Sequence, residues 1–361
     1  MKKRVTLRDV AAAAGVHFTT VGLALRCDPR INSRTAEVIR EKAKEMGYTH
    51  DAMLSALASY RHFNPRRFSG VVAFVTTMPF DPYDRDLRED GVHRAFAGAM
   101  RQATELGFTV EAFNLKADGM TPKRLCEIFR ARNIQGVILA PIPVPGEFPV
   151  MDWNDFSVVA LGFSIIRPQL YRACLDLGEL TRLHMFELSR LGYQRIGFIL
   201  SANVHLRTAA NYLGAYLCAQ LAFPEKERIP PVCLNGVGPH QETVALWLKK
   251  YRPECVMITY PEMLDWIKAC GFEVPRDIGV SKISLDSISA HIAGIQEAYD
   301  LLGESAIDLV VSLIRANERG LPRHPSYVVV GGRWIFQPTV RQLRPVKKVL
   351  FHSLADLHHW V

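Results

Sequence analysis

The chain has 361 residues, of which 44 are lysine or arginine and 36 are aspartate or glutamate, so its formal charge is +8. This length predicts two or three domains with a sizeable core, and 48% hydrophobic with 22% charged residues excludes a wholly disordered chain. No apolar run reaches the roughly 18 residues that a membrane span needs. The seven cysteines are scattered and form no C-x-x-C pair, which argues against a disulfide framework. We therefore expect a cytoplasmic protein.

The positive charge is concentrated at the start of the chain. Residues 1–67 hold 13 lysines and arginines against 6 acidic residues, an excess of +7, whereas the other 294 residues hold 31 against 30, an excess of +1. Clustered basic residues favour a polyanionic partner such as nucleic acid. A solvated basic surface gives the same excess, so the charge alone leaves both interpretations open.

The basic segment has the pattern of three short helices. Thr6 is placed to cap a first helix, which Gly15 ends, and residues 16–21 begin a second helix after a tight turn. Asn32 is placed to cap a third helix. The apolar residues at helical spacing are Leu7, Val10, Ala11 and Ala14 in the first helix, and in the third we expect a buried stripe of Val38, Ile39, Ala43 and Met46. This succession is typical of a helix-turn-helix, although other small helical bundles share the periodicity.

The same segment resembles the DNA-binding head of the lactose-repressor (LacI/GalR) family. The motifs that carry this resemblance are Val5–Ala11, Ala14-Gly15-Val16, Thr20-Val21, Ile31-Asn32 and Gly47-Tyr48, without gaps over about sixty residues. The family binds double-stranded operator DNA as a dimer, through this head, a hinge helix and a two-lobed core that binds an effector. The resemblance therefore implies a sequence-specific transcription regulator, a repressor, that is controlled by a small molecule and is associated with the nucleoid.

The resemblance also implies which residues meet the DNA. Phe18 and Thr19 fall on the first base-reading positions of the second helix. Gly22 and Leu23 depart from the family's usual Ser and Arg, which removes a guanine contact worth roughly 1–3 kcal/mol of discrimination. The operator is therefore expected to differ from the family's commonest half-site. The residues that we expect at the DNA are Thr6, Arg8, His17, Phe18, Thr19, Thr20, Arg26, Arg30, Asn32 and Leu57.

Residues 48–58 correspond to the family's hinge. His50-Asp51 replaces the usual Pro-Asn pair, and Asp51 can cap a short helix over residues 52–58. Leu57 falls on the leucine that the family wedges into the minor groove, where apolar side chains kink DNA. A linker helix whose leucines pack on the core is the alternative.

From Ser69 onward, short apolar runs alternate with helical patterns. Such runs are typical of strands buried on both faces of a parallel sheet. The expected strands cover residues 70–75, 136–140, 156–161, 195–200 and 255–258, and the expected helices 95–105, 122–132, 179–190, 209–220 and 243–251. This alternation predicts an open α/β architecture with two sheets.

This part resembles the family's periplasmic-binding-protein-like core more loosely. The matching positions are Asp176, Leu191–Ile196, Val274–Ile278, Asp286 and Leu302-Gly303 with Ala306. The resemblance implies three chain crossings between the lobes, with residues near 291–325 returning to the first lobe. We expect a head over residues 1–49, a hinge and linker over 50–68, a core for effector binding and dimerisation over 69–340, and a tail over 341–361.

The effector positions are those at which this sequence departs most from the family. Tyr260-Pro261 follows a predicted strand where the family has Asn-Asp, and Asn211 replaces an arginine. A sugar site needs carboxylates, amides and aromatic rings around hydroxyl groups. The candidates of these kinds are Phe80, Arg207, Asn211, Tyr260, Trp266 and Asp286. Each has a purely structural alternative, such as core packing for Trp266 or a surface ion pair for Arg207.

Motifs of common enzymes are missing from the sequence, including G-x-S-x-G, the phosphate-binding G-x4-G-K-[ST] and H-E-x-x-H. We therefore expect no enzyme, cofactor or metal site. The main prediction is a homodimeric operator-binding regulator with a sugar or sugar derivative as effector. The alternative is a cytoplasmic sugar-binding module or enzyme whose basic head serves only for oligomerisation or non-specific binding of nucleic acid.

Overall fold

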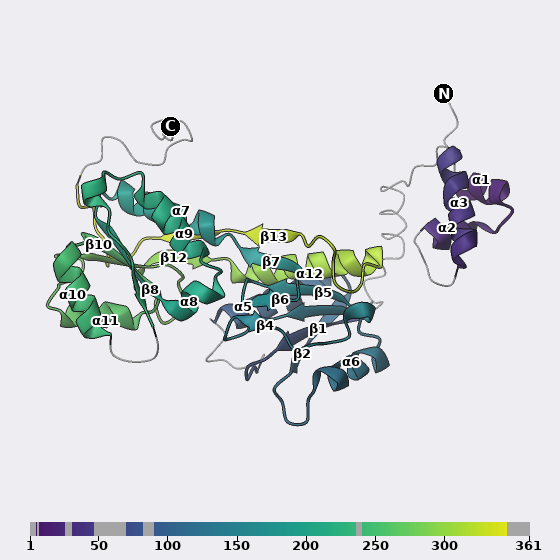
Figure 1. The fold of residues 1–361 in the computed structure, drawn as a ribbon, viewed down its shortest axis with the longest axis horizontal. Coiled ribbons are helices and arrows are strands. Elements are labelled where there is room, and N and C mark those ends of the chain that lie inside the picture. The colour runs from purple at the N-terminus through teal and green to yellow at the C-terminus, as the bar shows by residue number, and fades with distance from the viewer. Residues whose placement is uncertain are drawn as a thin grey trace.

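A computed structural model describes residues 5, 7–25, 31–46, 70–81, 90–235 and 240–344. These residues form a small helical head and an α/β core of two lobes (Figure 1). Among them, no helix is both long and apolar enough to cross a membrane.

The head consists of α1 (Leu7–Ala14), α2 (Phe18–Leu25) and α3 (Ser33–Glu45), in agreement with the three predicted helices. Gly15 makes the turn after α1 with a φ of +64°, a conformation that glycine adopts without strain. Asn32 caps α3, because its side-chain oxygen accepts a hydrogen bond of 2.9 Å from the amide of Arg34. The helices pack through a small apolar core that consists of Val10, Ala11, Val21, Ala24, Ala36, Ile39 and Ala43. Val38 was wrongly expected in the buried stripe of the third helix, since it is 54% exposed on the side of α3 away from this core.

The first lobe is built on a six-stranded parallel sheet with the order β13-β7-β5-β3-β1-β2. Its strands are β1 (Gly70–Thr76), β2 (Phe108–Asn114), β3 (Gly136–Leu139), β5 (Ser157–Leu161), β7 (Tyr171–Leu175) and β13 (Tyr327–Val330). Helices α5 (Gly91–Glu105) and α12 (Tyr299–Ala316) cover one face, and α6 (Pro122–Ala131) covers the other. A short pair, β4 (Gly146–Glu147) and β6 (Ile165–Arg167), lies beside the sheet (Figure 1).

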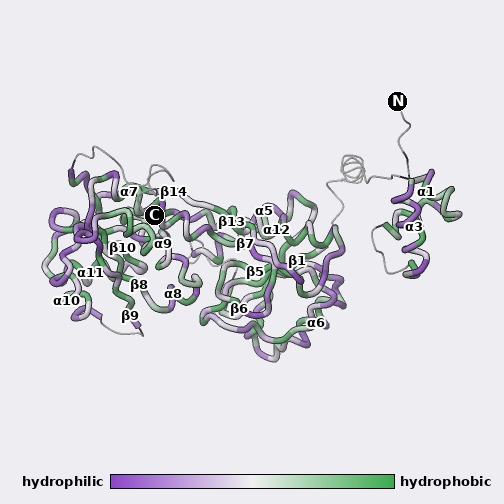
Figure 2. Tube along the Cα trace, turned by 45° about the horizontal axis from the view of Figure 1, so that its top comes forward, coloured by the Kyte–Doolittle hydropathy of each residue, from purple (hydrophilic) through white to green (hydrophobic). Residues whose placement is uncertain are grey.

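The side chains of β1 alternate between the two faces of the sheet, and both faces are buried. Val72 and Phe74 pack with α5 and α12, whereas Ala73 and Val75 pack with α6. Both faces therefore need apolar residues, which is why such strands read as continuous apolar runs. Figure 2 shows these runs as green segments in the strands of both lobes.

The second lobe has a sheet with the order β14-β12-β11-β10-β8-β9, in which only β14 is antiparallel to its neighbour. Its strands are β8 (Ile196–Ser201), β9 (Val232–Leu234), β10 (Cys255–Ile258), β11 (Gly279–Lys282), β12 (Ala293–Glu297) and β14 (Gly332–Ile335). Its helices are α7 (Leu177–Arg190), α8 (Ala202–Arg207), α9 (Asn211–Gln220), α10 (Gln241–Tyr251) and α11 (Glu262–Ala269). The two predicted sheets are therefore confirmed.

Within the described residues the chain passes between the lobes three times. The crossings lie at Asp176, between β7 and α7, at Ala298, between β12 and α12, and at Gly331, between β13 and β14. The segment that returns to the first lobe is therefore 299–330 rather than 291–325, because β12 pairs with β11 in the second lobe. Residues beyond the expected end of the core at 340 still bond to the second lobe, since Leu343 donates to the carbonyl of Leu191 over 2.7 Å.

In the first lobe, α5 and α12 approach each other closely. The contact is made at two glycines, Gly98 in α5 and Gly303 in α12. A Cβ atom placed on either would stand within 2.0 Å of a backbone carbonyl oxygen of the other helix, so only glycine allows this spacing.

Candidate DNA-binding head and effector cavity

One side of α2 is buried and the other is open. Val21 and Ala24 fill the head's core, whereas His17, Phe18 and Thr19 at the start of the helix are exposed, Phe18 by 41%. The ring of His17 lies 4.3 Å from that of Phe18, and its Nδ1 lies 2.8 Å from the hydroxyl of Thr19. The N-terminal turn of the second helix therefore presents an aromatic ring and hydrogen-bonding groups, which suits contact with base edges.

The remaining DNA-binding candidates are placed only in part. Thr20 is half-buried, and Asn32 uses its side-chain oxygen to cap α3. Arg8 is described only as a backbone position in α1. The candidates Thr6, Arg26, Arg30 and Leu57 lie outside the described residues, as does the whole predicted hinge.

A cavity of about 520 Å³ lies between the two lobes of the core. The first lobe lines it with residues that follow β3, β5 and β7 and with the starts of α5 and α12, and the second lobe with α8, α9 and the loops after β10 and β11. The cavity therefore lies at the carboxyl ends of parallel strands, where open α/β sheets bind ligands. Its volume is in the ordinary range for small-molecule sites.

A buried lysine at the end of β11 forms an ion pair at the cavity wall. Lys282 is 3% exposed, and its ammonium lies 2.9 Å from a carboxylate oxygen of Asp286. The other oxygen of Asp286 accepts hydrogen bonds from the amide and hydroxyl of Ser289, over 2.8 and 2.5 Å. Burial disfavours the ionised carboxylate, but the bonds from Ser289 and Lys282 outweigh it, so the pKa of Asp286 is lowered.

A second buried acid lies where the chain crosses between the lobes. Glu297, the last residue of β12, is fully buried, and its carboxylate accepts hydrogen bonds from the hydroxyls of Tyr212, at 2.5 Å, Ser284 and Tyr299. Burial raises the pKa of Glu297, and the three hydroxyl donors only partly oppose this effect.

The same crossing is held from the first lobe. Arg94 of α5 donates to the carbonyl of Glu297 over 3.2 Å and forms an ion pair with Asp300 at 3.4 Å. Groups of both lobes thus meet at the crossing between β12 and α12, in contact with the cavity-lining Tyr212, Ser284 and Tyr299.

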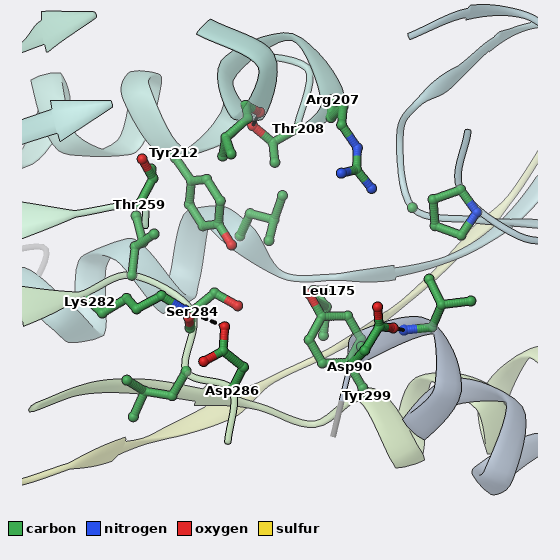
Figure 3. Close-up of a pocket in the computed structure, with 18 of the residues that line it drawn as sticks. Asp90, Leu175, Arg207, Thr208, Tyr212, Thr259, Lys282, Ser284, Asp286 and Tyr299 are labelled. Atoms are coloured by element: carbon green, nitrogen blue, oxygen red, sulfur yellow. Dashed lines mark hydrogen bonds and ion pairs between the residues drawn. The ribbon is translucent and has the colours of Figure 1, made fainter. Parts of the chain in front are cut away.

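The structure brings three of the six effector candidates to the cavity. Arg207, Tyr260 and Asp286 line it, and Figure 3 shows Arg207 and Asp286 on different sides of the open space. Phe80, Asn211 and Trp266 do not line it.

Each of these three has other partners. Phe80 packs in an aromatic cluster with Phe74, Phe96 and His93, at ring distances of 4.5 to 5.9 Å. Asn211 donates to the carbonyl of Thr208 over 2.8 Å at the start of α9. Trp266 packs on the apolar core beneath α10 and α11. Trp266 thus takes the core position that was its structural alternative.

Three polar residues that line the cavity, Lys282, Tyr212 and Tyr299, were not predicted, nor was Glu297, which bonds to both tyrosines. Lys282 and Glu297 carried a signal, because each places a charged residue at the end of a short run of strand-forming residues. A charge in a strand that is buried on both faces needs a partner, and such pairs cluster at functional sites. The two tyrosines sit in helices among other apolar residues and carried no such signal.

Comparison with known proteins identifies the head. Residues 6–51 match the model of the family described as bacterial regulatory proteins, lacI family. The chain carries a LacI-family DNA-binding head. The Maltose regulon regulatory protein MalI of Escherichia coli (strain K12) is 25% identical over 231 residues, which cover 61% of this chain and 60% of MalI. The match therefore spans less than two thirds of that relative.

Solved structures show the same fold across most of this chain. The lac repressor dimer bound to operator and the anti-inducer ONPF superposes with a TM-score of 0.54 at 17% identity, covering 94% of this chain and 100% of that one. A periplasmic binding protein/LacI transcriptional regulator from Alkaliphilus metalliredigens QYMF, complexed with D-xylulofuranose, gives 0.53 at 14% identity, covering 75% and 99%. The predicted head and two-lobed, periplasmic-binding-protein-like core are thus confirmed. The named relatives are regulators, in agreement with the expectation that the chain is not an enzyme.

Proposed function

We propose that this chain is a transcriptional repressor that binds a palindromic operator as a homodimer in the cytoplasm, at the nucleoid. The observation that carries the proposal is the exposed start of α2, with Phe18 and Thr19, in a head that matches the LacI family. Two heads on a two-fold dimer present two such helices to successive major grooves. Arg8, Arg26 and Arg30 then act through phosphates and make the affinity depend on salt.

The interlobe cavity is the proposed site of the effector, a small polar molecule such as a sugar or sugar derivative. This part of the proposal is supported by the position of the cavity at the strand ends and by the sugar bound to the A. metalliredigens relative. Because both lobes line the cavity, a ligand that prefers one arrangement of the lobes changes the position of the heads. Coupling of about 1–3 kcal/mol changes operator affinity roughly 5–150-fold.

Footprinting of the full chain on genomic fragments, starting with those beside its own gene, tests operator binding. The expected result is protection of a palindrome whose affinity falls steeply with salt. Phe18→Ala is expected to weaken binding to the palindrome far more than binding to unrelated DNA. Val38→Ala is the matched control, because it also removes an exposed apolar side chain but from α3 (54% exposed). Uniform coating without a protected palindrome contradicts the proposal and favours a core with a non-specific basic head.

A further inference from the structure

Most polar groups around the cavity already have partners within the protein. The carboxylate of Asp286 is held by Lys282 and Ser289, and that of Glu297 by three hydroxyls. Asp90, at the start of α5, accepts from two backbone amides of that helix, over 2.6 and 3.2 Å. Glu297 does not line the cavity, and the two carboxylates that do, Asp286 and Asp90, thus offer fewer free acceptor positions to the hydroxyl groups of a neutral sugar.

Three of the smaller polar side chains of the cavity have partners as well. The hydroxyl of Thr208 donates to the carbonyl of Val204 over 2.7 Å, and that of Thr259 accepts from the amide of Ser201 over 3.2 Å. Ser164 accepts from the amide of Ile142 over 2.9 Å. In the described part of the chain, no asparagine or glutamine lines the cavity. The amides that orient hydroxyl groups in many sugar sites are thus missing from this wall.

Arg207 is the exception among the charged lining groups. It ends α8 and is half-buried, and its guanidinium points into the open space in Figure 3. No residue of the described ranges forms a hydrogen bond or an ion pair with it. Its positive charge is felt at the hydroxyl of Tyr299 on the facing lobe, where it lowers the pKa of that tyrosine against the larger effect of burial.

The rest of the wall is mainly apolar. Its apolar residues come from both lobes and are Val92, Pro141, Phe163, Leu175, Leu177, Val204, Ile283, Leu285, Ile288 and Leu302. Such a wall binds a carbon skeleton, and one guanidinium binds one carboxylate through two parallel hydrogen bonds. Among the described lining residues, no free cation is left for a second negative charge on the ligand, because Lys282 is committed to Asp286.

We propose that the effector is a small organic monoanion, whose carboxylate pairs with Arg207 and whose carbon body packs on the apolar wall. This inference rests on the proposed function, in which the cavity is the effector site. The carboxylate has two possible sources, a sugar acid and an organic acid that is not a sugar, and the experiment separates them.

The test is a thermal-shift screen of the full chain, followed by calorimetric titration of each hit. The probes are matched pairs that differ in charge and little in shape. Galacturonate with galactose and glucuronate with glucose represent sugar acids, and phenylacetate with phenylacetamide and isovalerate with isovaleramide represent other acids. Binding of the sugar acids, or instead of the acids that are not sugars, identifies the chemical class of the ligand that carries the carboxylate.

Three variants accompany the screen. Arg207→Gln is expected to weaken binding of the acid roughly 10- to 100-fold, because a hydrogen-bonded charge pair is lost. Arg207→Lys is expected to retain part of the affinity, since it keeps the charge but loses the two-pronged geometry. Arg182→Gln is the control, because Arg182 pairs with Glu179 on the exposed side of α7 and does not line the cavity. Unchanged melting of unliganded Arg207→Gln shows that the variant folds.

The outcomes separate the monoanion assignment from the proposed regulator function. Equal binding of an acid and its neutral partner, unchanged binding by Arg207→Gln, or no shift with any probe overturns the monoanion assignment. None of these results bears on operator footprinting, which tests the proposed function separately. If an acid binds and no operator exists, the anion site stands and the regulator proposal fails. If an operator exists and a bound acid leaves its affinity unchanged, the acid is not the effector.

Discussion

Replacing Gly303 by alanine tests the close crossing of α5 and α12. The added methyl group would stand 1.8 Å from the carbonyl oxygen of Ala95 and 2.8 Å from the amide nitrogen of Ala99, whereas ordinary contact begins near 3.4 Å. The shortfall at Ala95 is 1.6 Å, the difference between 3.4 and 1.8 Å, and backbone atoms cannot rotate away. The two helices must therefore move apart and loosen their packing over the sheet.

The expected loss follows from two opposing effects. Overpacking against backbone costs about 3 kcal/mol, at the upper end of the usual range, and alanine gains about 1 kcal/mol over glycine in a helix. The net destabilisation is then about 2 kcal/mol, or a fall in Tm of roughly 4–8 °C for a unit of this size. Urea unfolding followed by circular dichroism, with Tm from calorimetry, measures it.

Gly214→Ala is the matched control for this substitution. Gly214 lies in α9 with open space around its Cα, so alanine is expected to stabilise the protein by about 0.5–1 kcal/mol. Gly98→Ala repeats the test from the other helix, because its Cβ would stand 2.0 Å from the carbonyl oxygen of Asp300. If Gly303→Ala and Gly98→Ala are as stable as the parent, the helices do not cross at this distance and the packing argument is wrong.

Three further predictions concern the site, the core and the hinge. Asp286→Asn leaves Lys282 buried without its counterion, and we expect a loss of about 2 kcal/mol at pH 7. Because the folded pKa of Asp286 is lowered, its contribution is fully present above the unfolded value near 3.8 and is lost as pH falls through the folded value, so the difference between variant and parent should shrink progressively below pH 3.8. His184, fully buried with its Nε2 2.8 Å from the hydroxyl of Ser281, has a pKa lowered by burial to about 3. Between pH 6.5 and 3 only the unfolded state binds this proton, so the free energy of unfolding decreases as the pH is lowered through that window. His184→Gln should flatten the plot of unfolding free energy against pH. An unchanged slope contradicts the assignment. Leu57→Ala should weaken operator binding and DNA bending far more than non-specific binding, as measured by gel shift with bent-DNA standards; a variant that bends its operator like the parent makes Leu57 a packing residue.

Helix caps, turns and apolar runs predicted these parts of the fold because each is specified by residues close together in the sequence. The cap at Asn32, the turn at Gly15 and the apolar run of β1 are each specified within a few residues. Of the larger sheets, β1, β3, β5, β8 and β10 were predicted, whereas the other strands were not. The edge strand β13 pairs with β7 on one side only, and its first three residues are exposed, so it lacks a continuous buried run. The strand β7 is buried, but Arg172 interrupts its apolar run.

The cavity was harder to predict because it is assembled from distant segments. Asp286, Arg207 and Tyr260 were proposed from their residue types and from positions after strands, and they meet at the cavity. Phe80 and Trp266 have suitable types as well, but their rings turn toward apolar neighbours in single lobes. Which way a side chain turns depends on packing between elements, and a single sequence does not contain that information.

The order in which the segments of the first lobe occur along the chain has a consequence for synthesis on the ribosome. The strand β7 ends at Leu175, yet α12, which covers β3, β5 and β7, begins only at Tyr299, 124 residues later by subtraction. At translation rates of about 5–20 residues per second, roughly 6–25 s pass while α5 alone is available to cover this apolar face. The second lobe likewise receives its edge strand β14 after α12. A message cut short before Tyr299 therefore yields the head and an incomplete first lobe, without the α12 residues Tyr299 and Leu302 that line the cavity. Under the proposed function, such a product would keep its DNA-binding head and lack a complete effector site.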